Sequence, residues 1–256
     1  MALTDAGKEY IMNQTDFLQG KCAIVTGASG GIGSALCKKL AGYGMNLVLS
    51  GRSKEALEKT AQLVRDGGGN ALICAGDLTS MDYLRSLPQQ AIQAFGRLDV
   101  VINNAGQAQH SAFTEVTEEM FDSIMATNEK APYFLCQYAL PYLQNSEEAT
   151  IINICSVVAH KGYPLQSTYA ASKHALLGFS KSLANETYDK NIRVHVISPG
   201  AVYTRMSLFS RPDLSPEGMP VPEDVADIVG FYLEHRHSDA VIDEIELHRS
   251  NKAPFA

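Results

Sequence analysis

The sequence lacks the features that mark membrane and exported proteins. None of its apolar runs approaches the roughly 20 residues that a helix needs to cross a bilayer. The first twenty residues mix charged and apolar positions and contain no continuous hydrophobic stretch of the signal-peptide kind. We therefore expect no membrane partner and a cytoplasmic location.

Positive charge is also scarce, because the chain carries a formal net charge of −7 at pH 7. Proteins that bind nucleic acid by neutralising its phosphates need a surplus of lysine and arginine. The composition therefore argues against a nucleic-acid partner.

The cysteines show no metal or disulfide pattern. No CxxC pair and no His/Cys pair has the spacing of a metal site. We interpret the cysteines as reduced core residues in a reducing compartment and expect no metal centre. The five residues are widely spaced along the chain: Cys22, Cys37, Cys74, Cys136 and Cys155.

Neither an internal repeat nor a linker divides the 256 residues, which fits one large domain with a single core. We expect an N-terminal extension over residues 1–20 and one domain over residues 21–256. The stretch 207–222 contains four prolines. It is long enough to predict a lid, at about residues 205–222, rather than a domain boundary.

Short β-branched runs alternate with longer amphipathic stretches, which is the pattern of βαβ units around a parallel sheet. Residues 54–66 repeat apolar positions at helical spacing, and three glycines follow. Several strands are apolar at successive positions, as strands covered on both faces should be. The pattern predicts an α/β fold with a doubly wound, seven-stranded parallel sheet. The expected strands are residues 21–26, 46–50, 70–75, 98–103, 150–155, 192–198 and 241–247.

The first strand runs into the glycine-rich segment TGASGGIG, residues 26–33, and then into a helical stretch. Glycines let backbone N–H groups and a helix N-terminus approach a pyrophosphate, since no Cβ blocks the way. The spacing is Gly-xxx-Gly-x-Gly, so a structural turn of similar composition is the alternative. We predict a phosphate loop whose contacts are Gly27, Ser29, Gly31, Ile32 and Gly33.

The end of the second strand carries Arg52 and has no acidic residue where an NAD-binding protein would hold the ribose hydroxyls. A guanidinium pairs with a 2′-phosphate through a bidentate, charge-assisted contact. Arg52 therefore favours NADP(H) over NAD(H); the alternative is a solvated residue at a helix start.

The segment YAASK, residues 169–173, opens another helical stretch. The i, i+4 spacing puts Tyr169 and Lys173 on one helix face, where an ammonium stabilises a phenolate and lowers the pKa of a tyrosine. Such a pair by itself is common in surface packing.

Together these motifs resemble the short-chain dehydrogenase/reductase family. The similarity rests on TGASGGIG (26–33), NNAG (103–106), YAASK (169–173) and PGAVYT (199–204), with Ser156 thirteen residues before Tyr169. They occur in the family's order and extend over about residues 21–247.

The resemblance implies a Rossmann-type sheet that binds NAD(P) and a catalytic set of Asn128, Ser156, Tyr169 and Lys173. Ser156 would hydrogen-bond the substrate oxygen, and Tyr169 would donate the proton as the nicotinamide gives up its hydride. Lys173 would hold the nicotinamide ribose and depress the tyrosine pKa. Asn128 would help to hold a water that links the lysine to solvent.

The same residue-by-residue comparison implies further cofactor contacts at the carboxyl ends of the strands. Asp77 and Leu78 would flank the adenine. The contacts to the adenosine ribose would come from Asn104, Ala105 and Gly106. The segment that meets the nicotinamide carboxamide would supply Pro199, Gly200, Val202 and Thr204.

Two departures from the family's pattern bear on the expected substrate and on the expected cofactor. Many members that reduce acyl-carrier-bound ketones have a glycine in the seventh strand and an Asp-Gly-Gly turn, whereas residues 240–256 contain no glycine. This argues against ketoacyl thioester reduction. Gly30 stands where NADP-preferring relatives often carry Arg or Lys, so the NADP preference rests on Arg52.

The predicted activity is interconversion of a carbonyl compound and an alcohol, acting on CH–OH groups with NAD(P). A cofactor-binding sensor or regulator without turnover is the alternative, although it would not need Ser156, Tyr169 and Lys173 together. An epimerase of the extended branch would require a different glycine spacing and a longer substrate domain.

Five residues near the motif ends or in the lid are expected to be pocket wall or surface rather than catalysts: His110, His160, Tyr163, Met206 and Phe209. By analogy, helices at 117–144 and 167–188 would join copies of the chain into a homodimer or homotetramer.

Overall fold

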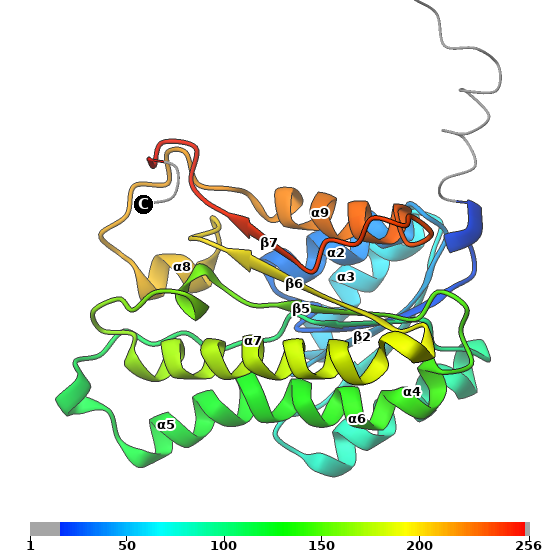
Figure 1. The fold of residues 1–256 in the computed structure, drawn as a ribbon, viewed down its shortest axis with the longest axis horizontal. Coiled ribbons are helices and arrows are strands. Elements are labelled where there is room, and N and C mark those ends of the chain that lie inside the picture. The colour runs from blue at the N-terminus through cyan, green and yellow to red at the C-terminus, as the bar shows by residue number, and fades with distance from the viewer. Residues whose placement is uncertain (1–15, 254–256) are drawn as a thin grey trace, which may run out of the picture.

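A computed structural model describes residues 16–253, so most of the predicted N-terminal extension and the last three residues lie outside the described part. The described chain forms one seven-stranded parallel sheet in the order β3-β2-β1-β4-β5-β6-β7 (Figure 1). All seven predicted strands are present, and β4 and β7 begin two to three residues later than predicted. The strands are β1 (Cys22–Thr26), β2 (Asn46–Gly51), β3 (Asn70–Ala75), β4 (Val100–Asn103), β5 (Thr150–Ile154), β6 (Arg193–Pro199) and β7 (Glu244–Leu247).

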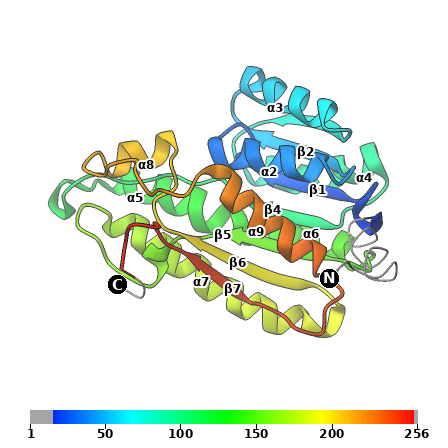
Figure 2. The ribbon, with the colours of Figure 1, turned by 90° about the horizontal axis from the view of Figure 1, so that it is seen from above.

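Helices cover both faces of the sheet (Figure 2). One face packs against α2 (Gly31–Ala41), α3 (Lys54–Asp66) and α9 (Pro222–Glu234). The other packs against α4 (Met81–Phe95), α6 (Ala131–Leu143) and α7 (Ser167–Thr187). Two shorter helices are α5 (Glu118–Met125) and α8 (Arg205–Ser210). The protein is therefore a Rossmann-type doubly wound sheet in a single domain.

Strand β1 shows why the central strands are apolar at most successive positions. Ala23 and Val25 belong to the core beneath α2, whereas Cys22 and Ile24 belong to the core beneath α4. Successive side chains point to opposite faces of a sheet, so a strand between two helical layers must be apolar on both. All five cysteines are free and buried, which fits their interpretation as core residues.

The helix at residues 54–66 has the bounds that the sequence predicted. Ser53 precedes it in an extended conformation, and its side chain accepts a hydrogen bond from the backbone N–H of Ala56 at 3.2 Å. This contact satisfies one of the donors that a helix start leaves unpaired. Arg52 is the single residue between the end of β2 at Gly51 and this cap at Ser53, so the local sequence determines its position.

The sheet also determines where a ligand can bind. Strand β1 lies between β2 and β4, so the chain turns to opposite sides of the sheet after β1 and after β3. Ligands of open α/β sheets bind at the carboxyl ends of the strands beside such a switch point. Strands β1 to β6 all end at this edge, and the segments that follow them begin there, since every strand is parallel to its neighbours.

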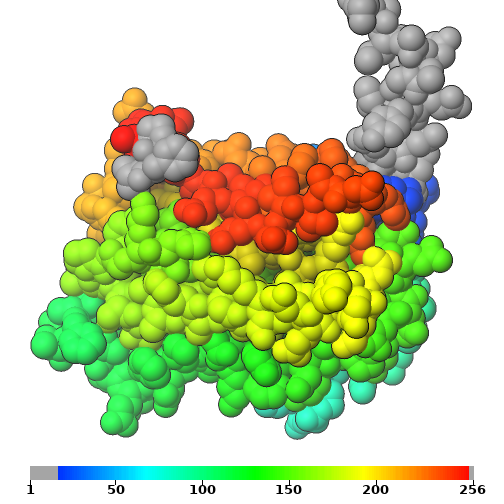
Figure 3. All heavy atoms as spheres, viewed as in Figure 1, coloured from blue at the N-terminus to red at the C-terminus, as the bar shows by residue number. Residues whose placement is uncertain are grey.

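None of the helices within residues 16–253 combines the length and the apolar character that a bilayer-spanning helix requires. Strand β7 ends the sheet, and Figure 3 shows the chain around it at the molecular surface.

His195 is a buried titratable group in β6. Its ring is 2% exposed and stacks on Tyr232, with the ring centroids 4.2 Å apart. Nδ1 lies 2.8 Å from the carbonyl oxygen of Ile242, while Nε2 has no partner among the described residues. Burial lowers the pKa of His195 from 6.5 to about 4, because a charged imidazolium there would lose its hydration.

We expect this histidine to weaken the fold in acid. Between pH 6.5 and pH 4 the unfolded chain binds a proton that the folded chain excludes, so stability falls as the pH drops through this window and is unaffected above it. The free energy of unfolding should fall by about 3 kcal/mol between pH 7 and pH 4 on account of this group. Urea unfolding at both pH values should show a smaller acid loss for His195→Phe than for wild type. The exposed control His174→Gln should lose as much as wild type, and an equal loss in all three would contradict the prediction.

Candidate active site

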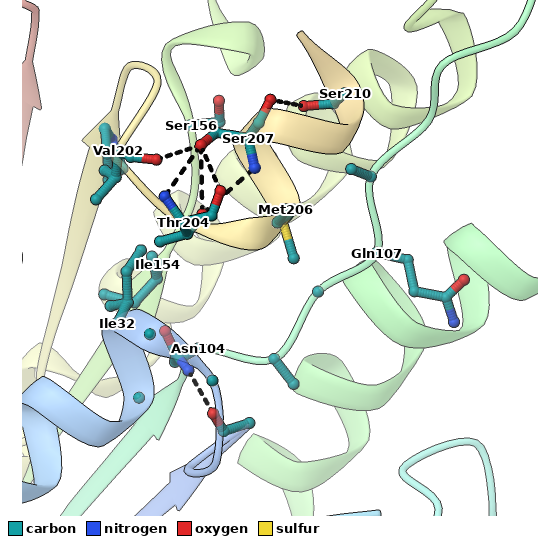
Figure 4. Close-up of a pocket in the computed structure, with 18 of the residues that line it drawn as sticks. Ile32, Asn104, Gln107, Ile154, Ser156, Val202, Thr204, Met206, Ser207 and Ser210 are labelled. Carbon is teal, nitrogen blue, oxygen red and sulfur yellow. Dashed lines mark hydrogen bonds between the residues drawn. The ribbon is translucent and has the colours of Figure 1, made fainter. Parts of the chain in front are cut away.

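One large cleft, of about 1930 Å³, runs along the carboxyl ends of the strands. Every residue that the sequence predicted as a cofactor contact lines it, and so does Ser156. Figure 4 shows part of this cleft, with Ile32 and Asn104 at one side and Thr204 and Met206 of the α8 region facing them. The predicted contacts that line it are Gly27, Ser29, Gly31, Ile32, Gly33, Arg52, Asp77, Leu78, Asn104, Ala105, Gly106, Tyr169, Lys173, Pro199, Gly200, Val202 and Thr204.

The glycine-rich segment after β1 is packed too closely for side chains. Gly27 has a φ of +63°, and a Cβ there would lie 2.9 Å from the Cα of Ala105. A Cβ on Gly33 would lie 2.1 Å from the carbonyl oxygen of Gly27. The first turn of α2 carries no acidic residue, and Gly30 provides no side-chain cap. Open N–H groups and the positive end of the helix dipole therefore face the cleft, which fits a pyrophosphate.

Thr26 ties this loop to the NNAG segment after β4. Its hydroxyl accepts hydrogen bonds from the backbone N–H groups of Asn104 and Ala105 at 3.0 and 3.1 Å. The Asn104 amide in turn donates to the carbonyl oxygens of Thr26 and Gly27 at 2.9 and 3.2 Å, and one of these two bonds is drawn in Figure 4. Two loops that are almost eighty residues apart are thus held as one rigid wall.

Three charged residues lie at the end of the cleft formed by β2, β3 and α3. Arg52 is exposed and follows β2 directly. Asp77 follows β3, and its pKa is lowered mainly by the hydrogen bond from the Thr79 backbone and to a smaller extent by the charge of Arg52. Lys59 of α3 also lines the cleft and pairs with Glu55 at 3.2 Å. This end therefore has two cations that an anionic group on a ligand can reach.

Ser156, Tyr169 and Lys173 come together beside the ends of β5 and β6. Ser156 follows β5, and Tyr169 and Lys173 lie one turn apart on α7. The ammonium of Lys173 is 5.9 Å from the centre of the Tyr169 ring and donates to the carbonyl oxygen of Ile154 at 2.9 Å. Ser156 and Lys173 are buried, and Tyr169 is partly buried.

The pKa of Tyr169 differs from the sequence-based expectation. Burial raises it from 10 to about 12, and the hydrogen bond with Ser156 offsets only part of this rise. Burial also lowers the pKa of Lys173. Desolvation outweighs the expected effect of the ammonium, which is turned toward Ile154. At neutral pH the phenol is therefore protonated, the state that a proton donor needs.

Asn128 does not line the cleft but lies just behind its wall. It is 1% exposed and sits in a π-helical turn, η3 (Ala126–Lys130), between α5 and α6. Its Oδ1 accepts from the Gln107 backbone at 2.7 Å, and its Nδ2 donates to Gln107 and to the Ser172 hydroxyl at 2.9 and 3.0 Å. A Cβ on Gly106 would lie 3.5 Å from Asn128 Oδ1 and 3.9 Å from Lys173 Nζ. Asn128 and Lys173 thus approach the same bare glycine from two helices.

Two of the five expected pocket residues, Tyr163 and Met206, line the cleft. The other three do not. His110 Nδ1 lies 3.0 Å from the Ser210 carbonyl oxygen, and His160 Nε2 lies 2.7 Å from a Glu244 carboxylate oxygen. Phe209 is 64% exposed. The two histidines join separate segments instead of facing a ligand.

The predicted lid consists of α8 and the loop 211–221 (Figure 2). Arg249, near the C-terminus, donates to the carbonyl oxygens of Ser215 and Glu217 at 2.8 and 2.7 Å, and Ser250 N–H donates to Gly218 at 3.0 Å. The C-terminal segment therefore fixes the loop, and both contribute residues to the lining of the cleft.

A family model described as short chain dehydrogenase matches residues 21–214, most of the chain. The chain belongs to the short-chain dehydrogenase family. This short-chain dehydrogenase is 33% identical over 237 residues to the 3-oxoacyl-(acyl-carrier-protein) reductase FabG of Chlamydia muridarum, covering 89% of this chain and 95% of that protein.

Two solved structures resemble this chain over nearly its whole length. A metagenomic short-chain oxidoreductase in complex with NADP has a TM-score of 0.79 and 30% identity, covering 92% of this chain and 99% of that one. A short-chain dehydrogenase from Mycobacterium paratuberculosis bound to NAD has a TM-score of 0.80 and 28% identity, covering 90% and 97%. The protein is an oxidoreductase that acts on CH–OH or carbonyl groups with a nicotinamide cofactor.

Sequence reasoning missed several residues that build the site of this short-chain dehydrogenase. Thr26 was counted only as the start of the glycine motif, and Lys59 only as part of a helix. Gln107 directly follows NNAG and Gln109 lies two residues further on, yet no local pattern distinguishes them from ordinary loop residues. Their position after a binding motif at a strand end was the one available signal.

Proposed function

We propose that this protein is an NADP(H)-dependent oxidoreductase that interconverts a small-molecule carbonyl compound and an alcohol, with Tyr169 as the general acid and base. The observation that carries the proposal is the assembly of Ser156, Tyr169 and Lys173 on one wall of a cleft whose far end is the glycine-rich loop. A nucleotide-binding regulator on the same fold has no use for this assembly.

A bound nicotinamide would supply the hydride, and the chain's own residues would manage the oxygen and the proton. The Ser156 hydroxyl would donate a hydrogen bond to the substrate oxygen. The Tyr169 phenol, with its pKa raised to about 12, would give its proton to that oxygen as negative charge develops there. Lys173 has three donors and uses one on Ile154, which leaves two for the nicotinamide ribose hydroxyls. Asn128 would hold the water that links Lys173 to solvent.

The choice of NADP(H) over NAD(H) rests on Arg52, which is exposed at the end of β2 and lines the cleft. Lys59 supports it as a second cation from α3 on the same wall. No acidic residue follows β2 directly to hold the two ribose hydroxyls of NAD.

We also propose that two or more copies of the chain associate through the helices at 117–144 and 167–188, which are α5, α6 and α7. These helices expose Met120, Phe121 and Tyr133, which are 37%, 44% and 42% accessible in the single chain. Large apolar side chains left exposed on the single chain favour an interface between copies.

The activity is tested by incubating the purified protein with NADPH and a panel of ketones and aldehydes while following absorbance of the reduced nicotinamide. Wild type should oxidise NADPH with at least one carbonyl compound and should not do so without one. NADPH binding without turnover over the whole panel would contradict the enzyme and favour the regulator.

A further inference from the structure

The helix that carries Tyr169 and Lys173 has no cap of its own. Helix α7 begins at Ser167, and the side chain of Gln166, at the capping position, makes no capping hydrogen bond. The first N–H groups of any helix have no partner within it. In α7 these groups belong to Ser167, Thr168 and Tyr169, and Thr168 is 4% exposed.

A residue from a distant loop takes over this task. The side-chain Oε1 of Gln109 accepts hydrogen bonds from the backbone N–H groups of Thr168 and Tyr169 at 2.8 and 3.2 Å. These are the second and third helical residues, the donors that a capping side chain ordinarily satisfies. Gln109 lies in the loop after NNAG, about sixty residues before the helix it caps.

The carboxamide of Gln109 is fixed in orientation. It is 2% exposed, and its Nε2 donates to the Ser111 hydroxyl at 3.2 Å. The backbone N–H of Ser111 donates to the carbonyl oxygen of Leu165 at 3.2 Å, just before α7. Leu165 itself has a φ of +65°, a conformation that costs energy for a leucine and is kept only where its surroundings hold it. The loop and the start of α7 therefore hold each other at two points.

We propose that Gln109 is a positioning residue for the reaction. The proposal rests on the proposed function, because Gln109 does not line the cleft and touches no reacting atom. One of the two hydrogen bonds that its Oε1 accepts comes from the backbone N–H of Tyr169 itself. By fixing the first turn of α7, Gln109 holds the phenol at the place where it meets Ser156 and the substrate oxygen.

The loop that carries Gln109 also contacts Asn128, another residue of the predicted catalytic set. The backbone N–H of its first residue, Gln107, donates to Asn128 Oδ1 at 2.7 Å, and Asn128 Nδ2 donates to the Gln107 carbonyl oxygen at 2.9 Å. Asn128 also donates to Ser172 of α7. One short segment after β4 thus contacts the elements that carry Asn128, Tyr169 and Lys173, and Gln109 is its contact nearest to the tyrosine.

Three variants test the proposal, with kcat and KM for NADPH measured on the carbonyl compound that wild type reduces. Gln109→Met keeps the length of the side chain but has no oxygen acceptor. We expect kcat to fall by about 10²-fold, because a small displacement of a reacting group can lower the rate by that factor. KM for NADPH should stay within about twofold, because the phosphate loop is untouched. Gln109→Glu retains an acceptor for both N–H groups and should recover most of kcat.

Thr117→Ala is the matched control. Thr117 caps α5 by accepting from the Met120 N–H at 3.2 Å, so its loss also removes a helix cap, but at a helix that carries no catalytic residue. This variant should lose stability and keep kcat. A similar fall of kcat in Thr117→Ala would mean that any lost cap impairs the enzyme, and it would overturn the specific role of Gln109.

Hydrogen exchange of the Thr168 and Tyr169 amides reports on the cap without reference to turnover. Both should exchange slowly in wild type and Gln109→Glu, and fast in Gln109→Met. Fast exchange together with an unchanged kcat would show that the cap is only structural and would overturn the proposal. Absence of turnover in wild type on every carbonyl compound would instead overturn the proposed function, and with it this role.

Discussion

Replacing Tyr169 by phenylalanine is expected to lower kcat for carbonyl reduction by about 10²–10⁴-fold, the range that a positioned general acid contributes. The variant removes one hydroxyl group from a partly buried ring and leaves the phosphate loop, Arg52 and Lys173 in place. Binding of NADPH, measured by fluorescence titration, should therefore survive. Because the pKa of Tyr169 is raised to about 12, the lost group is a protonated donor at neutral pH and not a phenolate.

A matched control comes from the same part of the chain. Tyr188 directly follows α7 and is 79% exposed, so Tyr188→Phe removes an equivalent hydroxyl far from the cleft and should keep full activity. Undiminished turnover in Tyr169→Phe would refute the mechanism, which assigns the proton to the phenol that shares a hydrogen bond with Ser156.

Exchanging Arg52 for aspartate is expected to reverse the cofactor preference. A charge-assisted hydrogen bond contributes about 1.5–3 kcal/mol, so its loss should lower kcat/KM for NADPH by about 10- to 100-fold. The new carboxylate would repel the 2′-phosphate and accept hydrogen bonds from the ribose hydroxyls of NADH. The ratio of kcat/KM for the two cofactors measures both effects.

The control for Arg52→Asp changes the same charge at a neighbouring site. Arg65 lies near the end of α3, pairs with Glu58 and does not line the cleft, so Arg65→Asp should leave the ratio unchanged. An unchanged ratio in Arg52→Asp would mean that the 2′-phosphate is held elsewhere. Lys59 is then the first alternative, since it lines the cleft from α3.

Much of the site was predictable because its motifs are short and attached to regular elements. A parallel sheet brings the carboxyl ends of its strands to one edge, so motifs placed after β1, β4, β5 and β6 had to meet there. This is why residues as far apart as Gly27 and Thr204 line one cleft. The spacing of Tyr169 and Lys173 likewise needed only the helical repeat.

Other parts of the site depend on contacts between residues that are distant in the sequence. Gln109 caps α7, and Arg249 hydrogen-bonds the loop 211–221. Both contacts join segments that share no local sequence pattern. The π-helical turn at Asn128 interrupts a stretch that the sequence presents as one long helix. The pKa of Tyr169 depends on how deeply the folded chain buries the phenol, which spacing alone cannot give.

By itself, the sequence determined the parallel α/β sheet, the glycine-rich loop, the Tyr169–Lys173 pair and the family. These follow from periodicity, from the need for bare glycines and from motif order, all of which are local properties of the chain. Only the tertiary structure decided that Asn128 lies behind the cleft wall, that Lys59 and Arg52 line the same end of the cleft, and that Gln109 caps the helix that carries Tyr169. The physical reason is that buried hydrogen-bonding groups must find partners, and folding chooses those partners by proximity in space.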